Sequence, residues 1–580
     1  MTALIEKHEK TLIIIILAIA LMARLWGLAS PALNDSEASQ ALQALSTVRG
    51  EDSAWGSQAL YLQATTFVFY LAGANEFTAR LIPALLGTLI VFVPLLFRRR
   101  LGLTVSLLTA LFLAIDPGLV SLSRQAGGMS LAMVFAGLAL GFWDQRRVKL
   151  AGVSLGLGLM SGPQFWVGAL IFGLTAGVFQ LLHRADAAGK ALEDGVPAQA
   201  DQAAVSAAAP FDYKLAAVAA GITVGIVGSL FLANLRGLSA TASALADFFA
   251  GWVSGGQVSI LSIFLGLLVY YPLALGFGLV RTGKAWWDED LIYQLISLWF
   301  ILGLVVLVIY PGRQMADLIW VAAPLWALAA REIEHLLTKP ASEWVVSSGY
   351  AILVFVLLVF TWQNLSGIAE NPLRPEGVMM PAFYIMGAVA LGAVGGLLLA
   401  WGWGGQPILR GLGLGLLTAL MLYSISLVSA AGQMRETATS ELWVDGRSLS
   451  TNLVVDTVDQ LSLINHGVNG KLDVVLQGIE SPSLKWALRN YALVEVDMLP
   501  ANQMPSIVIS PVQEQPVLAA AYRGQGLVLS EQPGWPLMVS SDFLPWLVAH
   551  DMPQNQTQVI LWVRNDLFAG GSPNTLVTQN

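Results

Sequence analysis

Long uninterrupted runs of apolar residues fill most of the first 432 residues of this chain and limit what it can fold into. A helix that crosses a lipid bilayer needs about 20 consecutive apolar residues. Charged residues make up only 12% of the 580-residue sequence, whereas a soluble domain has about 25%. Candidate spans lie near residues 11–28, 78–97, 103–121, 128–144, 149–161, 164–182, 213–233, 258–280, 290–310, 314–331, 345–366, 380–402 and 408–430. The sequence therefore predicts a polytopic α-helical membrane domain over residues 1–432, with about thirteen transmembrane helices.

Some segments of this domain need a different interpretation. The apolar stretch 59–73 lies in a long first outer loop, 29–77, and we expect it to form a helix in the membrane interface. Segment 183–212 is polar and rich in alanine, so we expect a mobile cytoplasmic linker. The run 11–28 is longer than the roughly 7–15 residues of a signal-peptide core, and we expect a retained helix. A break at Gly162-Pro163 leaves open two short tilted helices or one long kinked helix.

Positively charged residues fall on alternate connections between the spans. Cytoplasmic connections of membrane proteins carry an excess of Lys and Arg. The residues concerned are Arg98, Arg99, Arg100, Arg146, Arg147, Lys149, Arg281, Lys284, Arg331 and Lys339. They share one side if the N-terminus is cytoplasmic, which predicts a multi-pass plasma-membrane protein with an extracytoplasmic C-terminal domain. The segments then placed outside are 29–77, 116–127, 234–257, 311–313, 367–379 and 431–580.

Residues 433–580 have the composition of a soluble domain and alternate short apolar strands with helices. The predicted strands are 472–477, 493–498, 506–510 and 558–563, and the predicted helices are 449–464, 483–491 and 542–550. This alternation is typical of a small α/β layer. The segment carries no nucleophile elbow, P-loop or zinc motif. We expect it to cap the membrane site or to bind an acceptor, with a purely structural lid as the alternative.

Charge and residue types exclude several kinds of function. The net charge of −8 and the lack of a basic stripe argue against nucleic acid as a partner. Because cysteine is absent, the chain has no disulfide, thiolate metal site or cysteine nucleophile. None of the five histidines lies in an outer loop of the membrane domain, so no histidine-ligated metal site is expected at the outer membrane face.

The first outer loop carries two acidic residues, Asp35 and Glu37, directly after the first span. If residues 34–37 are extended, both carboxylates point the same way. They could then accept a proton from a hydroxyl nucleophile or hold a divalent cation. The alternative is a capping box, in which Asn34 caps a helix and Glu37 occupies its third position. The two interpretations are compatible, because Glu37 can cap the helix while Asp35 faces a cleft.

A second charged feature, Arg313 with Asp317, lies at the outer end of the span 314–331. The two residues are one turn apart on one helical face and can form an ion pair. Arg313 could instead clamp a lipid-linked phosphate with its planar guanidinium group. The other outer-side cations are Arg24, Arg80, Arg124 and Arg236. Each could anchor a helix end at the headgroups, or together they could surround the acidic pair and bind an anionic lipid donor.

Several of these segments together resemble the GT-C membrane glycosyltransferases. The resemblance includes the acidic pair after the first span and the amphipathic helix that follows it. It also includes Asn75-Glu-Phe-Thr-Ala-Arg80 at the second span, Ser123-Arg124, and Arg313 followed by Val-Ala-Ala-Pro324. These segments are similar to the group of protein O-mannosyltransferases and lipid A aminoarabinose transferases. Two further segments, Ser483-Leu-Lys-Trp-Ala-Leu-Arg489 and Val559-Ile-Leu-Trp-Val-Arg564, are similar to a bacterial and archaeal branch named for an association with flippase activity.

The resemblance implies a polyprenyl-phosphate sugar donor that is used from the outer leaflet. The sugar would pass to an acceptor hydroxyl with inversion. The implied roles are Asp35 as base with Glu37 as its partner and Arg313 as a ligand of the donor phosphate. From their outer-side positions we also expect Arg124 and Arg80 to bind the donor phosphate, with Asp317, Arg24 and Arg236 as supporting residues.

The chain departs from the family pattern in two places. The family often has an adjacent Asp-Glu pair, whereas Ser36 separates the two acids here, so either Asp35 or Glu37 could be the base. Residues 51–63 also lack the Glu-Lys-Pro-type donor motif of the aminoarabinose enzymes.

Two other functions fit the same sequence. A lipid or lipid-linked sugar flippase would be expected to show repeated halves and charges near the middle of the membrane. The chain has no clear repeat, and its acids lie at the outer edge of the spans, which favours chemistry at the surface. A non-catalytic membrane scaffold that presents the C-terminal domain is the third hypothesis.

Overall fold

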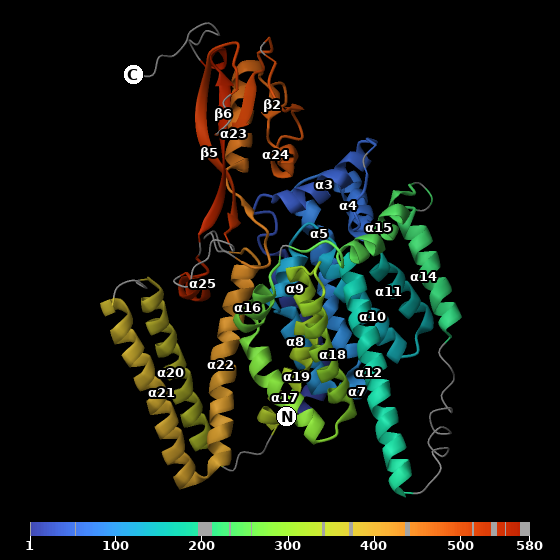
Figure 1. Ribbon diagram of the computed structural model, residues 1–580, viewed down its shortest axis with the longest axis vertical. Helices are drawn as coiled ribbons and strands as arrows, with labels where there is room; N and C mark the ends of the chain where they lie inside the picture. Colours follow the sequence, from blue (N-terminus) through green and yellow to red (C-terminus); the bar gives the residue numbers. More distant parts are fainter. Residues whose placement is uncertain are drawn as a thin grey trace.

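The computed structural model describes residues 2–52, 54–194, 212–230, 232, 234–256, 258–338, 343–370, 375–434, 441–500, 502–512, 516–534, 542–551 and 553–568. A helical bundle forms one part of the molecule, and a β-sheet domain stands at one end of it (Figure 1). Helix α7 (Arg98–Leu101) and the N-terminus lie at the other end of the bundle. The chain is a multi-pass membrane protein.

Most of the predicted spans are helical, some of them as two shorter helices, and further helices lie in the predicted loops. They are α1 (Thr2–Lys7), α2 (Glu9–Leu25), α3 (Asp35–Val48), α4 (Ala59–Ala72), α5 (Glu76–Gly87), α6 (Phe92–Leu96), α8 (Leu103–Ala114), α9 (Pro117–Ser123), α10 (Met129–Asp144), α11 (Val148–Leu159), α12 (Pro163–Asp194), α14 (Tyr213–Gly228), α15 (Arg236–Ala250), α16 (Ile260–Tyr270), α17 (Pro272–Trp287), α18 (Leu291–Ile309), α19 (Ile319–Thr338), α20 (Trp344–Glu370), α21 (Pro375–Trp403) and α22 (Gly405–Ala431). Short 3-10 turns, η1 (Thr88–Val91) and η2 (Met315–Leu318), precede α6 and α19.

The predicted count of thirteen transmembrane helices is not confirmed. Within the described residues, six helices are long and apolar enough to cross a membrane, or eight if each of two bent pairs counts as one span. The predicted span 258–280 is not one straight helix, because α16 and α17 meet at 95°. The pair α8 and α9 bends by 53°. Pro272 and Pro117 begin the second helix of each pair, and proline disfavours a helical conformation in the residue before it.

The structure also bears on the break at Gly162 and on the predicted linker 183–212. The break at Gly162 separates two helices, α11 and α12, and Gly162 has a φ of +118°, which favours glycine. The predicted linker 183–212 begins as a continuation of α12, which extends to Asp194. Residues 195–211 of that linker lie outside the described residues.

The core of the bundle is rich in aromatic side chains. Trp320 and Trp326 of α19 are fully buried, and the Trp326 ring stacks on Phe112 of α8 with 5.0 Å between centroids. Helices α20 and α21 stand to one side (Figure 1). Only 17% and 11% of the residues in their most apolar windows are buried by the protein, so these helices present most of their apolar surface to lipid.

The sheet domain confirms the predicted α/β layer. Within the described residues, six strands form one sheet in the order β1-β5-β6-β4-β2-β3. The strands are β1 (Arg447–Ser448), β2 (Asp473–Gln477), β3 (Ala492–Val496), β4 (Ile507–Pro511), β5 (Tyr522–Pro533) and β6 (Gln554–Arg564). Strand β2 is parallel to β3 and β4, whereas β6 is antiparallel to both of its neighbours. Helices α23 (Thr451–His466) and α24 (Pro482–Ala487) fall at two of the predicted positions.

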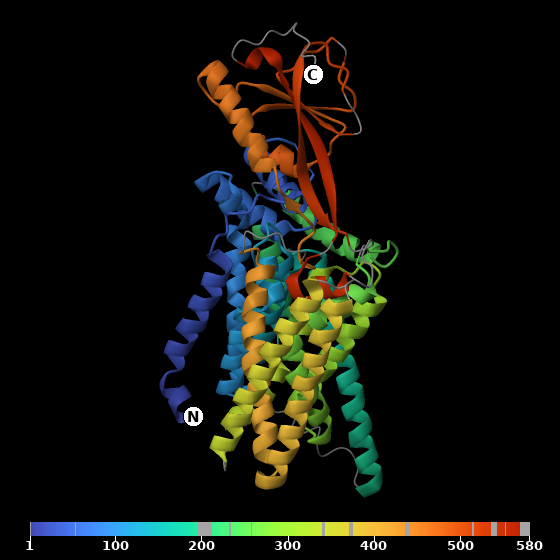
Figure 2. The same cartoon turned by 90° about the vertical axis from the view of Figure 1, so that its left-hand side faces the viewer.

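The third predicted helix, α25 (Phe543–Ala549), does not pack on the sheet. It lies in the connection between β5 and β6, and this long hairpin descends to the bundle (Figure 2). Trp546 of α25 is fully buried in the same apolar core as the helices. Nearby, His550 Nδ1 lies 3.3 Å from Glu441 Oε1, and Tyr270 of α16 donates a 2.6 Å hydrogen bond to Glu441 Oε2. The hairpin therefore anchors the sheet domain on the bundle.

Candidate active site

Helix α3 begins at the acidic pair, and its N-terminus has the predicted capping box. Asn34 Oδ1 accepts a 2.9 Å hydrogen bond from Glu37 N, and Glu37 Oε2 accepts one of 3.3 Å from Asn34 N. Residues 35–37 are thus helical, and the extended alternative is wrong. Residues two positions apart in an α-helix point about 200° apart around the helix axis. Asp35 and Glu37 therefore face different neighbours.

Glu37 forms a buried ion pair with Arg80 of α5. The guanidinium donates from Nε to Oε1 at 2.7 Å and from Nη2 to Oε2 at 2.6 Å. Its remaining hydrogen bonds go to the carbonyl oxygens of Leu28, Pro31 and Ala32. Ala126 N also donates to Glu37 Oε1 at 2.8 Å. The carboxylate therefore ties together α3, α5 and the loop after α9, and every N–H of Arg80 has an acceptor.

Arg124, the residue after α9, holds the C-terminal end of α2. Its Nε donates to the carbonyl oxygen of Gly432 at 2.6 Å. Its Nη atoms donate to the carbonyl oxygens of Ala23, Arg24, Trp26 and Gly27. A guanidinium at a helix C-terminus satisfies carbonyl groups that have no partner within the helix. Among the described residues, no carboxylate forms an ion pair with Arg124.

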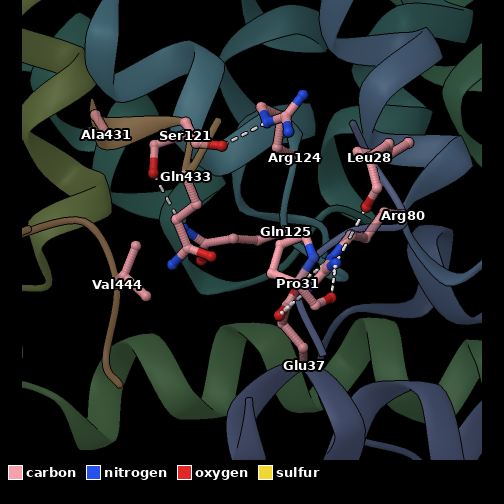
Figure 3. A pocket seen from close by; sticks show the side chains of 11 residues that line it. Leu28, Pro31, Glu37, Arg80, Ser121, Arg124, Gln125, Ala431, Gln433 and Val444 are labelled. Carbon is pink, nitrogen blue, oxygen red and sulfur yellow. Dashed lines mark hydrogen bonds and ion pairs between the residues drawn. The ribbon is translucent and has the colours of Figure 1, made fainter. Parts of the chain in front are cut away.

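Glu37, Arg80 and Arg124 line one pocket of about 260 Å³, which we call the arginine pocket (Figure 3). Its other lining residues are Leu28, Pro31, Ser121, Gln125, Ala431, Gly432, Gln433 and Val444. The charge of Glu37 neutralises Arg80, whereas Arg124 contacts uncharged groups. The lining groups therefore carry one net positive charge, which suits an anion such as a phosphate.

Asp35 lines a separate space of about 270 Å³ between α3 and the sheet domain, which we call the Asp35 crevice. Its Oδ1 accepts two 2.9 Å hydrogen bonds, from Ser481 Oγ and Ser483 N at the start of α24. Among the described residues, none donates a hydrogen bond to its Oδ2. Because Asp35 and Glu37 line different spaces, they do not form the ligand pair that a divalent cation would need.

The predicted supporting residues Arg24 and Arg236 lie outside both spaces. Arg24 is fully buried in α2 and donates to the carbonyl oxygens of Ala20 and Ala114 at 3.2 and 3.0 Å. Arg236 opens α15 and pairs with Asp52 at 2.6 Å in the connection between α3 and α4. Both arginines join segments of the bundle.

The predicted ion pair between Arg313 and Asp317 is wrong. Arg313 donates to the carbonyl oxygens of Val258 and Tyr310 at 3.0 and 2.9 Å. Asp317 caps the turn η2 and accepts a 2.8 Å hydrogen bond from Gln314 N. Because η2 is a 3-10 turn with its own cap, the two side chains do not stack as they would in an α-helix. Neither residue lines the arginine pocket or the Asp35 crevice.

Gln125 and Ser481 were not among the predicted site residues, although one lines the arginine pocket and the other contacts Asp35. Gln125 follows Arg124 and lines the arginine pocket, and its amide donates to the carbonyl oxygen of Trp443 at 2.8 Å. Ser481, which holds Asp35, caps α24 and precedes a proline at the first helical position. Ser-Pro at a helix start is a readable signal, but no sequence signal shows that this cap meets Asp35.

Comparison with known proteins supports the fold alone. No protein-family model matches the sequence, and no curated protein matches it at a significant level. ArnT from Cupriavidus metallidurans bound to undecaprenyl phosphate matches with a TM-score of 0.54 and 16% identity, over 86% of this chain and 93% of ArnT. ArnT in the apo state matches with a TM-score of 0.52 and 15% identity, over 87% of this chain and 94% of ArnT. The chain therefore has the fold of the GT-C membrane transferases, as the sequence resemblance implied.

Proposed function

We propose that this protein is a membrane glycosyltransferase that moves a sugar from a polyprenyl-phosphate donor to an acceptor hydroxyl, with inversion. The observation that carries the proposal is the arginine pocket, which combines Arg124 with the Glu37–Arg80 pair on one side of the α3 N-terminus. Asp35 lies on the other side, at the Asp35 crevice. The structural neighbour ArnT is bound to undecaprenyl phosphate, and this supports a polyprenyl-phosphate donor in the proposal.

The donor phosphate is assigned to the arginine pocket. Arg124 is the cation there without a carboxylate partner among the described residues, so it attracts the phosphate most strongly. Arg80 acts through its charge and by holding Glu37, since each of its N–H groups already has an acceptor. Negative charge grows on the phosphate as the sugar leaves, and fixed cations stabilise that charge. Arg313 is not part of this site, because it lines neither space.

Asp35 is the general base in this proposal. Its Oδ1 is held by Ser481 and Ser483, which leaves Oδ2 for an acceptor hydroxyl. Glu37 accepts four hydrogen bonds and is a structural group. The hydroxyl oxygen forms a new bond to the anomeric carbon as the bond to the phosphate oxygen breaks. The proton passes to Asp35, the polyprenyl phosphate leaves, and the single displacement inverts the anomeric centre.

The reaction is assigned to the non-cytoplasmic face of the membrane. The arginine-rich helix α7 and the N-terminus lie at the end of the bundle opposite the sheet domain (Figure 1). Clusters of Lys and Arg mark cytoplasmic connections. The sheet domain and both spaces therefore belong to the extracytoplasmic side.

The test uses the full-length protein in lipid nanodiscs with a panel of radiolabelled undecaprenyl-phosphate sugars. We expect release of labelled sugar by the unaltered protein and a loss of about 10²–10⁴-fold in Asp35→Asn, the usual contribution of a general base. The matched control is Asp52→Asn in the same loop, where the side chain is fully exposed, and it should keep full activity. Equal activity in Asp35→Asn and the control contradicts the assignment of the base.

The same preparation in sealed liposomes separates the alternative functions. A transferase breaks the bond between sugar and phosphate. A flippase moves the intact labelled lipid from one leaflet to the other, which a membrane-impermeant periodate treatment detects. Lipid movement without bond cleavage would favour a flippase, and the lack of both would favour a scaffold.

A further inference from the structure

The Asp35 crevice has two walls that come from distant parts of the chain. The bundle contributes Asn34, Asp35 and Ser36 at the start of α3. The sheet domain contributes the segment Asp445–Ser448 and the side chains of Ser530 and Gln532 on β5. We propose that this crevice binds the acceptor and that it selects a carbohydrate hydroxyl over a lipid or a peptide hydroxyl. The proposal rests on the proposed function and adds the class of acceptor to it.

The lining of the crevice is polar throughout. Its residues are carboxylates, hydroxyls, amides, one arginine and one glycine, with no aliphatic or aromatic side chain among the residues that line it. An acyl chain would bury apolar surface against groups that prefer water, which gives it no favourable free energy. A sugar hydroxyl both donates and accepts hydrogen bonds, and this lining offers both kinds of partner.

Donors and acceptors alternate along the sheet-domain wall. Asp445 accepts a hydrogen bond from Ser36, and desolvation by the surrounding chain raises its pKa. Desolvation lowers the pKa of Arg447, while the charges of Glu441 and Glu531 raise it. Neighbouring hydroxyls of a sugar can bridge a carboxylate and a guanidinium fork, because each hydroxyl donates to one and accepts from the other. A serine or threonine of a peptide presents one hydroxyl and has no neighbouring hydroxyl for a second such contact.

The sheet-domain wall is held in place before any ligand binds. Ser448 Oγ donates a 3.0 Å hydrogen bond to the carbonyl oxygen of Leu33, directly before the capping box. Strand β1 pairs with β5, so that Arg447 lies opposite Glu531 and Ser448 lies opposite Ser530. A preformed site loses less conformational entropy on binding than a flexible one.

A second contact fixes α24 on the first loop. Trp486 is 2% exposed and donates from Nε1 to Glu76 Oε1 at 3.0 Å. Arg489 donates to the carbonyl oxygen of Ala74 at 3.0 Å, and its guanidinium lies 4.3 Å from the Trp486 ring centroid. The same helix presents Ser481 and Ser483 to Asp35. The sheet domain thus positions the base and forms half of the crevice that the acceptor would enter.

The test compares three acceptors in nanodiscs that contain the full-length protein and an active labelled donor. The acceptors are a panel of methyl glycosides, a serine- and threonine-containing peptide, and diacylglycerol. We expect transfer to a methyl glycoside and at least about tenfold less to the peptide and the lipid, because a site built for hydroxyl pairs rejects ligands that leave its groups unpaired. A preference for the peptide or diacylglycerol would overturn the proposal.

Variants of the sheet-domain wall test whether its residues recognise the carbohydrate acceptor. Gln532→Ala and Arg447→Gln should each lower kcat/KM for the methyl glycoside about tenfold. Hydrolysis of the donor by water should stay within about twofold, because water needs no sheet-domain partner. The matched control is Lys485→Gln, which removes an ion pair with Glu495 elsewhere in the sheet domain. Unchanged glycoside transfer in both variants would contradict the proposal.

A binding measurement separates this proposal from the proposed function. Saturation-transfer NMR detects contacts between methyl glycosides and the protein without a donor. Binding to the unaltered protein but not to Gln532→Ala, together with no donor turnover, would retain the carbohydrate site and reject the transferase. Donor turnover without glycoside binding or transfer would retain the transferase and reject the carbohydrate site.

Discussion

The Arg80 guanidinium and the Glu37 carboxylate meet in a two-point contact, with 2.7 Å from Nε to Oε1 and 2.6 Å from Nη2 to Oε2. Their side chains are only 3% and 6% exposed. The contact joins the first loop to the second span and fixes the carboxylate away from Asp35. Glu37 therefore has a structural role, and Asp35 is the acid to which we assign the role of base.

Substitution of Arg80 tests this structural role. Arg80→Met should lower the free energy of unfolding by about 3–5 kcal/mol, because it leaves a buried carboxylate without its partner. Reversible unfolding in mixed micelles measures the change. The matched control is Lys485→Met, whose ion pair is partly exposed and should contribute about 0–1 kcal/mol. Equal effects of the two substitutions would contradict a buried, structural Glu37–Arg80 pair.

Affinity for undecaprenyl phosphate tests the arginine pocket. Arg124→Gln should weaken binding about tenfold to a hundredfold, the equivalent of a charge-assisted hydrogen bond of about 1.5–3 kcal/mol. Native mass spectrometry with undecaprenyl phosphate measures the affinity directly. Arg313→Gln is the control, because Arg313 lines neither space and should bind the lipid as the unaltered protein does. The opposite ranking of the two variants would move the phosphate site to Arg313.

The contact between the sheet domain and the first loop depends on Trp486. Trp486→Ala should cost about 3–5 kcal/mol, because it leaves a cavity between α24 and α3 and removes the hydrogen bond to Glu76. Hydrogen exchange should then increase in residues 74–76 and 481–489, which face each other across this contact. Arg49→Ala removes an exposed contact to the Arg489 carbonyl and should leave exchange unchanged. Unchanged protection in Trp486→Ala would show that the hairpin alone holds the domain.

The raised pKa of Asp445 predicts a pH-dependent stability. The folded protein favours the neutral carboxyl of Asp445 over the ionised carboxylate. The neutral carboxyl therefore makes its full contribution to stability below the ordinary pKa of 3.8, and this contribution is lost as the pH rises through the raised pKa. Asp445→Asn should therefore raise Tm at pH 7, and the difference from the unaltered protein should shrink toward pH 4. Scans of Tm against pH measure this difference. A Tm difference that grows on acidification would contradict the sign of the pKa shift.

Much of the fold could be predicted from local sequence. Apolar runs located the helices of the bundle, because length and composition decide which segments can cross a bilayer. The capping box at Asn34 and Glu37 was also readable, since it depends on residues three apart. Strand β5 was missed because Gly524 and Gly526 lower its strand propensity, and its pairing with β6 overrides that tendency.

The candidate site was harder to predict because it depends on contacts between distant segments. Arg80 contacts Glu37, and Arg124 lines the same pocket, because the start of α5 and the segment after α9 approach the start of α3, which no local pattern specifies. Ser481 reaches Asp35 across 446 positions of the sequence. Arg313 was predicted from the family pattern to bind the donor phosphate. Its side chain, just before the turn η2, instead donates to the carbonyl oxygens of Val258 and Tyr310.

The β5–β6 hairpin has a consequence for how the protein is made. Trp546 lies in the connection of that hairpin and is buried in the bundle core, where its ring contacts His550, and the His550 ring in turn lies 6.1 Å from that of Tyr270. The ribosome synthesises it after every membrane helix described here, so the bundle core remains incomplete until the C-terminal segment has been made. A gene shortened after the final span would encode all of the membrane helices, but the core of the resulting bundle would lack the Trp546 side chain.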